Sequence, residues 1–263
     1  MQIINLNDEN RHLYFMCLED WSDEIKEAGN HKEIWYNKMK DKGLRIKFAA
    51  DDDGILGGMI HYLPIEYSFV EGKDLYFINC IWVHGYKKGR GNFQKQGMGK
   101  ALLKAAEEDI KQLGAKGLAA WGVALPFWMK ASWFKKHGYK KVENMGGQVL
   151  LWKPFTDDAL PPSWIKPKKD MDLGLNSDKV VLTLFKNGWC PAQNLTYERA
   201  KCIAEEFPDK VEFREINTFD KEVVCEWGIS DAFYINDKLV RTGPPPSYKK
   251  IRKLVARRVK KIS

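Results

Sequence analysis

The stretch QKQGMGKALL, residues 94–103, decides the fold prediction for the first half of the chain. Gly97 and Gly99 flank one methionine at the point where a helix must begin. A helix N-terminus presents about four N–H groups without intrahelical partners, and its dipole adds roughly half a positive charge. Glycine allows unusual backbone angles and removes the Cβ that would block a bulky anion. The stretch therefore predicts a loop that binds phosphate, or a tight strand–helix turn that binds nothing.

Known glycine motifs do not account for this stretch. A P-loop needs Gly-Lys followed by Ser or Thr, and a dinucleotide turn needs a third glycine where Leu102 stands. The flanking patterns predict mixed helices and strands. Strands are expected at 44–51, 55–69, 75–83, 117–123 and 148–154, and helices at 8–19, 23–40, 99–113 and 128–137. The turn Asp52–Gly54 predicts a hairpin between the first two strands.

The order Gln94, Gly97, Gly99 after a strand ending in Ile81–Val83 resembles the acyl-CoA loop of the GCN5-related N-acetyltransferases (GNAT). The downstream segment WFKKHGYKKVE, residues 133–143, resembles a second motif of that superfamily. The order of elements over residues 1–155 is also similar. The resemblance implies an α/β (α+β) fold in which a mixed sheet is flanked by helices, with residues 1–155 as the acetyltransferase domain.

The resemblance also implies acetyl-CoA as co-substrate. Its pyrophosphate would lie on backbone amides of the loop, and its pantetheine would pair with a strand end that splays from its neighbour. A strand N–H would polarise the acetyl carbonyl. The implied cofactor contacts are Ile81, Trp82, Val83, Gln94, Lys95, Gln96, Gly97, Met98, Gly99, Lys100 and Phe134. Phe134 stands where the family often has a tyrosine acid, and Leu125–Phe127 lacks the family's asparagine, so the proton donor is in doubt.

Acetyl transfer to an ammonium needs a base. Glu66 and His84 are the predicted catalytic residues, with Glu71 and Asp74 as alternatives. His84 could instead be a solvated loop histidine. The dense aromatic residues are mostly expected in the core, with some lining an aromatic acceptor pocket; they are Trp121, Phe127, Trp128, Trp133 and Phe134.

Residues 156–178 are rich in proline and predict a linker, and residues 179–263 predict a smaller second domain. Its predicted order, β-α-β-α-β-β-α, and Gly188-Trp189-Cys190-Pro191 resemble thioredoxin. Gln193 replaces the second cysteine. Either Cys190 is a single reactive thiol, or this is a degenerate thioredoxin-like domain that serves packing or acceptor binding. The run Pro244–Pro246 before the last helix resembles the YoaP-like C-terminal domain of some bacterial N-acetyltransferases.

The net charge of +8 is concentrated at the C-terminus, since residues 241–263 hold nine Lys or Arg and no Asp or Glu. The apolar stripe of the last helix favours docking on a sheet over nucleic-acid binding. Five scattered cysteines suit reduced thiols. No long apolar run and no signal peptide are found, so we expect a cytoplasmic protein without membrane partners.

These patterns predict an N-acetyltransferase that moves the acetyl group of acetyl-CoA to an amine, with a small molecule as the acceptor and no metal site. One alternative is a thiol-based redox or binding protein that uses Cys190, in which the first domain only binds acyl-CoA. A third hypothesis is a nucleic-acid-binding adaptor that uses the basic tail.

Overall fold

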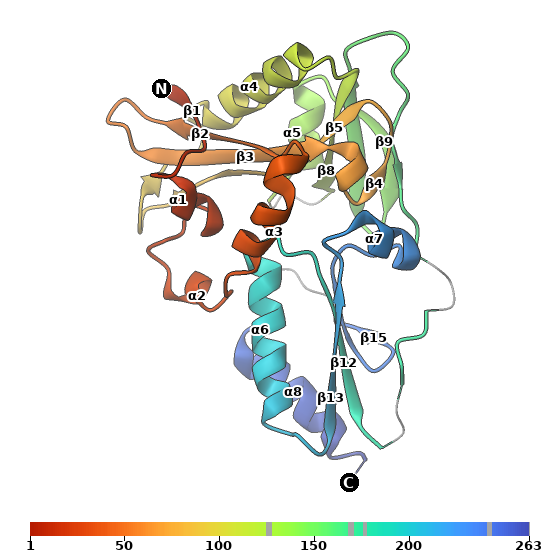
Figure 1. Cartoon of the computed structure of the whole chain (residues 1–263). Helices are drawn as coiled ribbons and strands as arrows, with labels where there is room; N and C mark the ends of the chain where they lie inside the picture. Colours follow the sequence, from red (N-terminus) through yellow and green to blue (C-terminus); the bar gives the residue numbers. More distant parts are fainter. Residues whose placement is uncertain (125–127, 168–170, 176–177, 241–243, 263) are drawn as a thin grey trace. The chain divides into compact units, whose positions relative to one another are not determined.

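The computed structural model describes residues 1–124, 128–167, 171–175, 178–240 and 244–262 (Figure 1). The chain forms two compact units. The first contains residues 1–22 and 36–165, and the second contains residues 23–35 and 166–263. In the part of the chain described, no helix is both long and apolar enough to cross a membrane.

A seven-stranded mixed sheet forms the centre of the first unit. Its strands, in spatial order, are β1 (Gln2–Asn5), β2 (Arg45–Ala50), β3 (Leu56–Pro64), β5 (Leu75–Val83), β8 (Gly117–Val123), β10 (Gln148–Pro154) and β9 (Lys140–Met145). Strands β5 and β8 are parallel, and the other neighbours are antiparallel. The first unit also contains two separate two-stranded antiparallel sheets. They pair β4 (Val70–Glu71) with β11 (Ser163–Trp164), and β6 (Gly85–Tyr86) with β7 (Gly91–Asn92).

Helices cover this sheet as the fold prediction requires (Figure 1). They are α1 (Arg11–Phe15), α4 (Met98–Gln112) and α5 (Ala131–Lys136), with 3₁₀ turns η1 (Lys40–Lys42) and η2 (Ile65–Tyr67). The apolar stripe of α4 packs on β2, β3 and β5 and is buried at Leu102, Leu103, Ala106 and Ile110. Gly114 ends the helix with a left-handed φ of 79°, which confirms the predicted stop signal.

The hairpin between β2 and β3 is confirmed. Asp51 Oδ1 accepts hydrogen bonds from the backbone N–H groups of Asp53 (3.1 Å) and Ile55 (2.8 Å), and Gly54 takes a left-handed φ of 80°. An aspartate side chain that bonds its own turn is a common way to fix such a loop. Trp164, in the proline-rich stretch, is buried and stacks on Phe69.

Several predicted limits were wrong. The helix expected at 8–19 stops at Phe15, because Cys17 and Leu18 take left-handed angles that a helix cannot contain. The helix expected at 23–40 is split into α2 (Asp23–Lys26) and α3 (His31–Met39) around Gly29, whose φ is 65°. The strand expected at 55–69 ends at Pro64, where η2 follows. The helix expected at 128–137 begins at Ala131, and residues 125–127 lie outside the described residues.

The second unit has a four-stranded sheet in the order β13-β12-β14-β15. Its elements follow the predicted order: β12 (Val180–Lys186), α6 (Pro191–Glu205), β13 (Val211–Asn217), α7 (Lys221–Trp227), β14 (Ala232–Ile235), β15 (Lys238–Leu239) and α8 (Tyr248–Val259). Strands β12 and β13 are parallel, whereas β14 is antiparallel to β12. The buried side chains Ile251 and Val255 dock α8 on the core, as its apolar stripe predicted.

Residues 23–35 join this second unit although they belong to the N-terminal part of the sequence. Arg199, which is 7% exposed, donates hydrogen bonds to Glu24 (2.7 Å), to Glu27 (3.2 Å) and to the carbonyl of Pro246 (3.1 Å). A buried guanidinium needs such partners, because an unpaired buried charge is costly. The predicted division into 1–155, 156–178 and 179–263 assigns residues 23–35 to the first domain. That division stays a prediction.

Candidate active site

The loop that precedes α4 is open and strongly bent. Lys95 and Gly97 take left-handed angles, with φ of 64° and 89°, and the first bond of the helix runs from the N–H of Ala101 to the carbonyl of Gly97. The N–H groups of the first turn of α4 therefore have no acceptor within the helix. A Cβ on Gly97 would meet nothing within 4 Å. Backbone curved in this way forms a concave surface suited to an anion.

Hydrogen bonds fix this loop in place. Asn92 Oδ1 accepts from the N–H of Gln94 (3.1 Å), and the Asn92 carbonyl accepts from Gln96 Nε2 (2.8 Å). The Gln94 side chain lies over Gly85, where a Cβ would come within 2.1 Å of its amide nitrogen. The predicted loop residues 94–100 therefore form one continuous loop and helix start. Met98 is buried, and the others are partly or fully exposed.

Strands β5 and β8 separate beside this loop. Their parallel pairing runs from Leu75–Gly117 to Ile78–Ala120 and stops there. The predicted residues Ile81, Trp82 and Val83 lie beyond the last pair and are half-buried. The expected splay of the strand end is confirmed by this register.

A bulge and two side chains occupy the start of the gap. Asn79 has no partner on β3, because Cys80 pairs with His61 and Ile78 pairs with Tyr62. Trp121 Nε1 donates to the carbonyl of Asn79 (2.8 Å), and the N–H of Ile81 donates to Met129 Sδ (3.5 Å). A thioether is a weak acceptor, so a ligand oxygen could replace it.

Sequence reasoning missed two polar atoms here. Within the described residues, Asn79 Oδ1 and Trp82 Nε1 are buried and have no hydrogen-bond partner. Such groups are rare because each costs free energy. A ligand in the gap could satisfy both an acceptor and a donor. The sequence signalled neither, because a bulge depends on pairing with β3.

The structure argues against His84 as the base, because both of its ring nitrogens have hydrogen-bond partners. It is fully buried; Trp21 Nε1 donates to its Nε2 (3.0 Å), and its Nδ1 lies 2.6 Å from the carbonyl of Gly91. With Nδ1 as the donor, both ring nitrogens are used. These contacts tie His84 to Trp21 and to the β6–β7 hairpin. The alternative of a solvated histidine is also wrong.

Glu66 is exposed but lies at the other end of β5. It follows Pro64, which pairs with Tyr76, five residues before Ile81. At about 3.3 Å per residue, that is roughly 17 Å along the strand. Asp74 precedes the same end and contacts Lys116 (3.5 Å). The register therefore argues against Glu66 and Asp74, and against Glu71 in β4, as bases at the splayed end.

Phe134 in α5 is fully buried and packs against Trp133 and Tyr139, so its ring is enclosed by protein. Burial raises the pKa of Tyr139 well above its usual value, which makes it a poor acid substitute. Half-buried Trp133 lies beside the loop, because its ring would be 3.4 Å from a Cβ on Gly99. Trp121 contacts Trp128 (5.2 Å between centroids), and Phe127 lies outside the described residues.

Cys190 lies in the second unit, at the N-cap of α6, and is half-buried. Its N–H donates to Asn187 Oδ1 (3.3 Å). Cys202 is exposed further along the same helix. The structure keeps Cys190 at the predicted strand–helix junction, and its reactivity stays a prediction.

Comparison with known proteins finds similar sequences and structures over parts of this chain. The chain is similar to the uncharacterized N-acetyltransferase YoaP of Bacillus subtilis (strain 168), with 23% identity over 199 residues, 73% of this chain and 72% of that protein. Solved structures of low similarity include a GNAT acetyltransferase from Staphylococcus aureus Mu50, with 14% identity, a TM-score of 0.43 and coverage of 59% of this chain and 99% of that one. A Bacillus subtilis acetyltransferase solved in complex with CoA has 20% identity, a TM-score of 0.40 and coverage of 59% and 99%.

The model of the "Acetyltransferase (GNAT) family" matches residues 7–139, just over half of the chain. This range contains the bent loop, the first turn of α4 and the splayed end of β5. The chain therefore belongs to the GNAT acetyltransferase family.

Proposed function

We propose that this protein transfers the acetyl group of acetyl-CoA to an amine, and that the acceptor is a small molecule. The observation that carries the proposal is the open N-terminus of α4, with Gly97 in a left-handed conformation beside the splayed end of β5. The description of the Bacillus relative as an N-acetyltransferase supports transfer to nitrogen.

The residues at the site fit the co-substrate. Backbone N–H groups of residues 95–100 would hold the pyrophosphate, where the helix dipole favours negative charge. The strand end Ile81–Val83 would pair with the pantetheine amides. Asn79 and Trp82, on the β5 segment beyond its last pair with β8, carry a buried acceptor and a buried donor without partners, which a ligand bound there could satisfy.

Acetyl-CoA supplies an activated acetyl group as a thioester. The N–H of Ile81, now on the thioether of Met129, is the donor we assign to the acetyl carbonyl. We assign no side-chain base, since Glu66 and His84 are not suitably placed, and Phe134 cannot donate a proton. The acceptor would then react as its neutral amine and lose its proton to water, while water protonates the departing thiolate.

Aromatic side chains support a small acceptor with an apolar part. Phe69 and Trp128 both contact Trp121, with ring centroids 6.3 and 5.2 Å away, and Trp121 bonds to the bulge at Asn79. Aromatic walls of this kind are typical of small-molecule sites.

We also propose a cytoplasmic protein with domains 1–155 and 179–263 joined by the linker 156–178. The parallel β12–β13 pair, the antiparallel β14 and the observed strand order support a thioredoxin-like second domain. Because Gln193 replaces a second cysteine, dithiol exchange is not part of the proposal.

The test is calorimetric titration with acetyl-CoA of the wild type and two matched variants. Gly97→Glu should lower the affinity about 100-fold, because backbone strain and a like charge both oppose the pyrophosphate. Gly114→Glu is the control: this glycine also has a left-handed φ and open surroundings, but it lies at the other end of α4. Equal losses in both variants, or no binding by the wild type, would contradict the proposal. A screen of amines for CoA release then identifies the acceptor class.

A further inference from the structure

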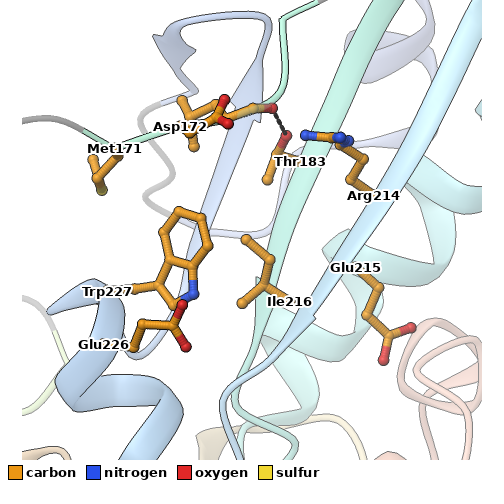
Figure 2. Close-up of a pocket in the computed structure, with 9 residues that line it drawn as sticks. Met171, Asp172, Thr183, Arg214, Glu215, Ile216, Glu226 and Trp227 are labelled. Atoms are coloured by element: carbon orange, nitrogen blue, oxygen red, sulfur yellow. Dashed lines mark hydrogen bonds between the residues drawn. The ribbon is translucent and has the colours of Figure 1, made fainter.

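The second unit contains a cavity of about 570 Å³ (Figure 2). Its lining residues are Met171, Asp172, Leu173, Thr183, Arg214, Glu215, Ile216, Glu226 and Trp227. Its floor is the sheet face that carries Thr183 and Ile216, while Leu182 and Leu184 belong to the core on the opposite face. A cavity of this size is typical of small-molecule sites, which measure roughly 300–1,000 Å³.

One wall of the cavity is apolar and aromatic. The Trp227 ring packs edge-on against Phe185, with centroids 5.4 Å apart, and Leu173 and Ile216 belong to the same apolar cluster. In the view of Figure 2 the Trp227 ring lies beside Ile216, with the Glu226 side chain below it. This wall would contact the apolar body of a ligand.

The opposite edge is held by local contacts. Asp172 Oδ1 accepts from the N–H of Gly174 (2.8 Å), and Thr183 Oγ1 donates to the carbonyl of Leu173 (3.4 Å). The Arg214 guanidinium lies on Gly174 so closely that a Cβ there would come within 1.2 Å of it. The cavity is therefore formed before any ligand arrives.

The charged residues that line the cavity include more acidic than basic side chains. Arg214 Nε donates to Glu212 Oε1 (2.8 Å), which neutralises this cation. Glu215 points away from the cavity (Figure 2) and pairs with Lys186 (2.6 Å). Among the described residues, neither Asp172 nor Glu226 has an ion pair. Within the described part of the chain, two exposed carboxylates of the lining, Asp172 and Glu226, thus lie at the cavity without an ion-pair partner.

We propose that this cavity binds an organic cation, namely an ammonium group attached to an apolar or aromatic body. The ammonium would lie between the carboxylates and the face of Trp227, which attracts cations, and the body would pack on Leu173 and Ile216. This site goes beyond acetyl transfer, because all its residues belong to the second unit.

The experiment is calorimetric titration of the full-length protein, without acetyl-CoA, with three probes of one skeleton: 2-phenylethylammonium, 3-phenylpropionate and 2-phenylethanol. We expect the ammonium to bind and the other two to bind at least tenfold more weakly. Glu226→Gln and Asp172→Asn should each weaken ammonium binding about tenfold, since each removes a charge-assisted contact. The control is Glu222→Gln, an exposed carboxylate on α7 outside the cavity lining, which should change nothing.

Three results would overturn the proposal. The first is tighter binding of the carboxylate, which would indicate an anion site at Arg214. The second is no binding of the ammonium at about 10 mM, a concentration well above a millimolar dissociation constant. The third is ammonium binding that neither Glu226→Gln nor Asp172→Asn weakens, which would place the probe elsewhere, for example in the acceptor site. Circular dichroism of each variant checks that the fold is retained.

Discussion

Two helices of the same length, α4 and α6, both 15 residues, begin in opposite ways. The start of α4 is exposed, and a Cβ on Gly97 would meet nothing within 4 Å. At the start of α6, Pro191 is buried, Asn187 is 1% exposed, and a Cβ on Gly188 would come within 2.4 Å of Phe219. Both helices have the same dipole. The difference teaches that a helix N-terminus is accessible to an anion only where the surrounding chain leaves it open.

The largest expected loss of stability comes from a feature that α4 and α6 share, namely side chains buried in a core. Leu102 in α4 and Ile203 in α6 are both fully buried. Leu102→Ala and Ile203→Ala should each cost about 2–5 kcal/mol of unfolding free energy, because each leaves a cavity in a packed core. Urea unfolding measures this, with exposed Leu113→Ala as the control. A loss below about 1 kcal/mol at either site would mean that the helix packs more loosely than the burial indicates.

The two glycines test the difference directly. Gly188→Ala should destabilise the protein by about 3 kcal/mol, because left-handed strain and a clash with Phe219 add together. Gly97→Ala should cost only about 1 kcal/mol of strain, since its surroundings are open. Thermal unfolding of both variants measures the contrast. Equal losses would show that the two starts are equally crowded and would break the comparison.

A half-buried acid next to the closed helix start, Asp231, should give the second unit a pH dependence. Burial raises the pKa of Asp231 to about 6, although Asn187 nearby favours the charged form. The folded state then binds a proton more tightly than the unfolded state, so this contribution is complete below about pH 4 and is lost as the pH rises through about 6. The expected loss is on the order of 2 kcal/mol.

Melting temperatures between pH 4 and 7 test this contribution. Asp231→Asn should flatten the profile in that window, whereas Asp209→Asn, an exposed site in the same unit, should leave it unchanged. The same slope in wild type and Asp231→Asn would assign the pH dependence to other groups.

The smallest expected loss of stability concerns the start of a third helix, α8. Ser247 caps α8, and its hydroxyl accepts from the N–H of Lys250 (3.3 Å). Ser247→Ala should cost about 1 kcal/mol, which is typical of a lost cap. Chemical denaturation measures it, with Ser247→Asp as a variant that keeps a cap acceptor. If Ser247→Asp is no more stable than Ser247→Ala, the hydroxyl has no capping role.

Local patterns predicted much of the fold. The apolar stripe of α4, the turn at Asp51–Gly54 and the stop at Gly114 were all confirmed, because each depends on neighbours within a few residues. The breaks at Leu18 and Gly29 were missed, since helix-forming residues surround both and the left-handed angles depend on packing.

The candidate site shows the same contrast between features that local sequence predicted and features that depend on tertiary contacts. The loop at Gly97 and the strand end at Ile81 were found from sequence, because glycine spacing and a strand–helix order are local signals. The base candidates stay predictions that the placement argues against, because the distance of a residue from the site depends on register. Pro64 pairs with Tyr76, which moves Glu66 away, and Trp21 donates to Nε2 of His84. The acceptor at Asn79 was missed because the bulge exists only in the paired sheet.

The sequence by itself determined the family, the broad order of the main strands and helices and the position of the glycine loop, because composition and spacing are properties of the chain. Only the tertiary structure decided that residues 23–35 join the second unit through Arg199, and that β5 leaves β8 after Ile78. It also decided that Asp172, Trp227 and Glu226 share one cavity. Contacts between residues far apart in sequence depend on strand register and on the packing of buried side chains, and no local pattern encodes either.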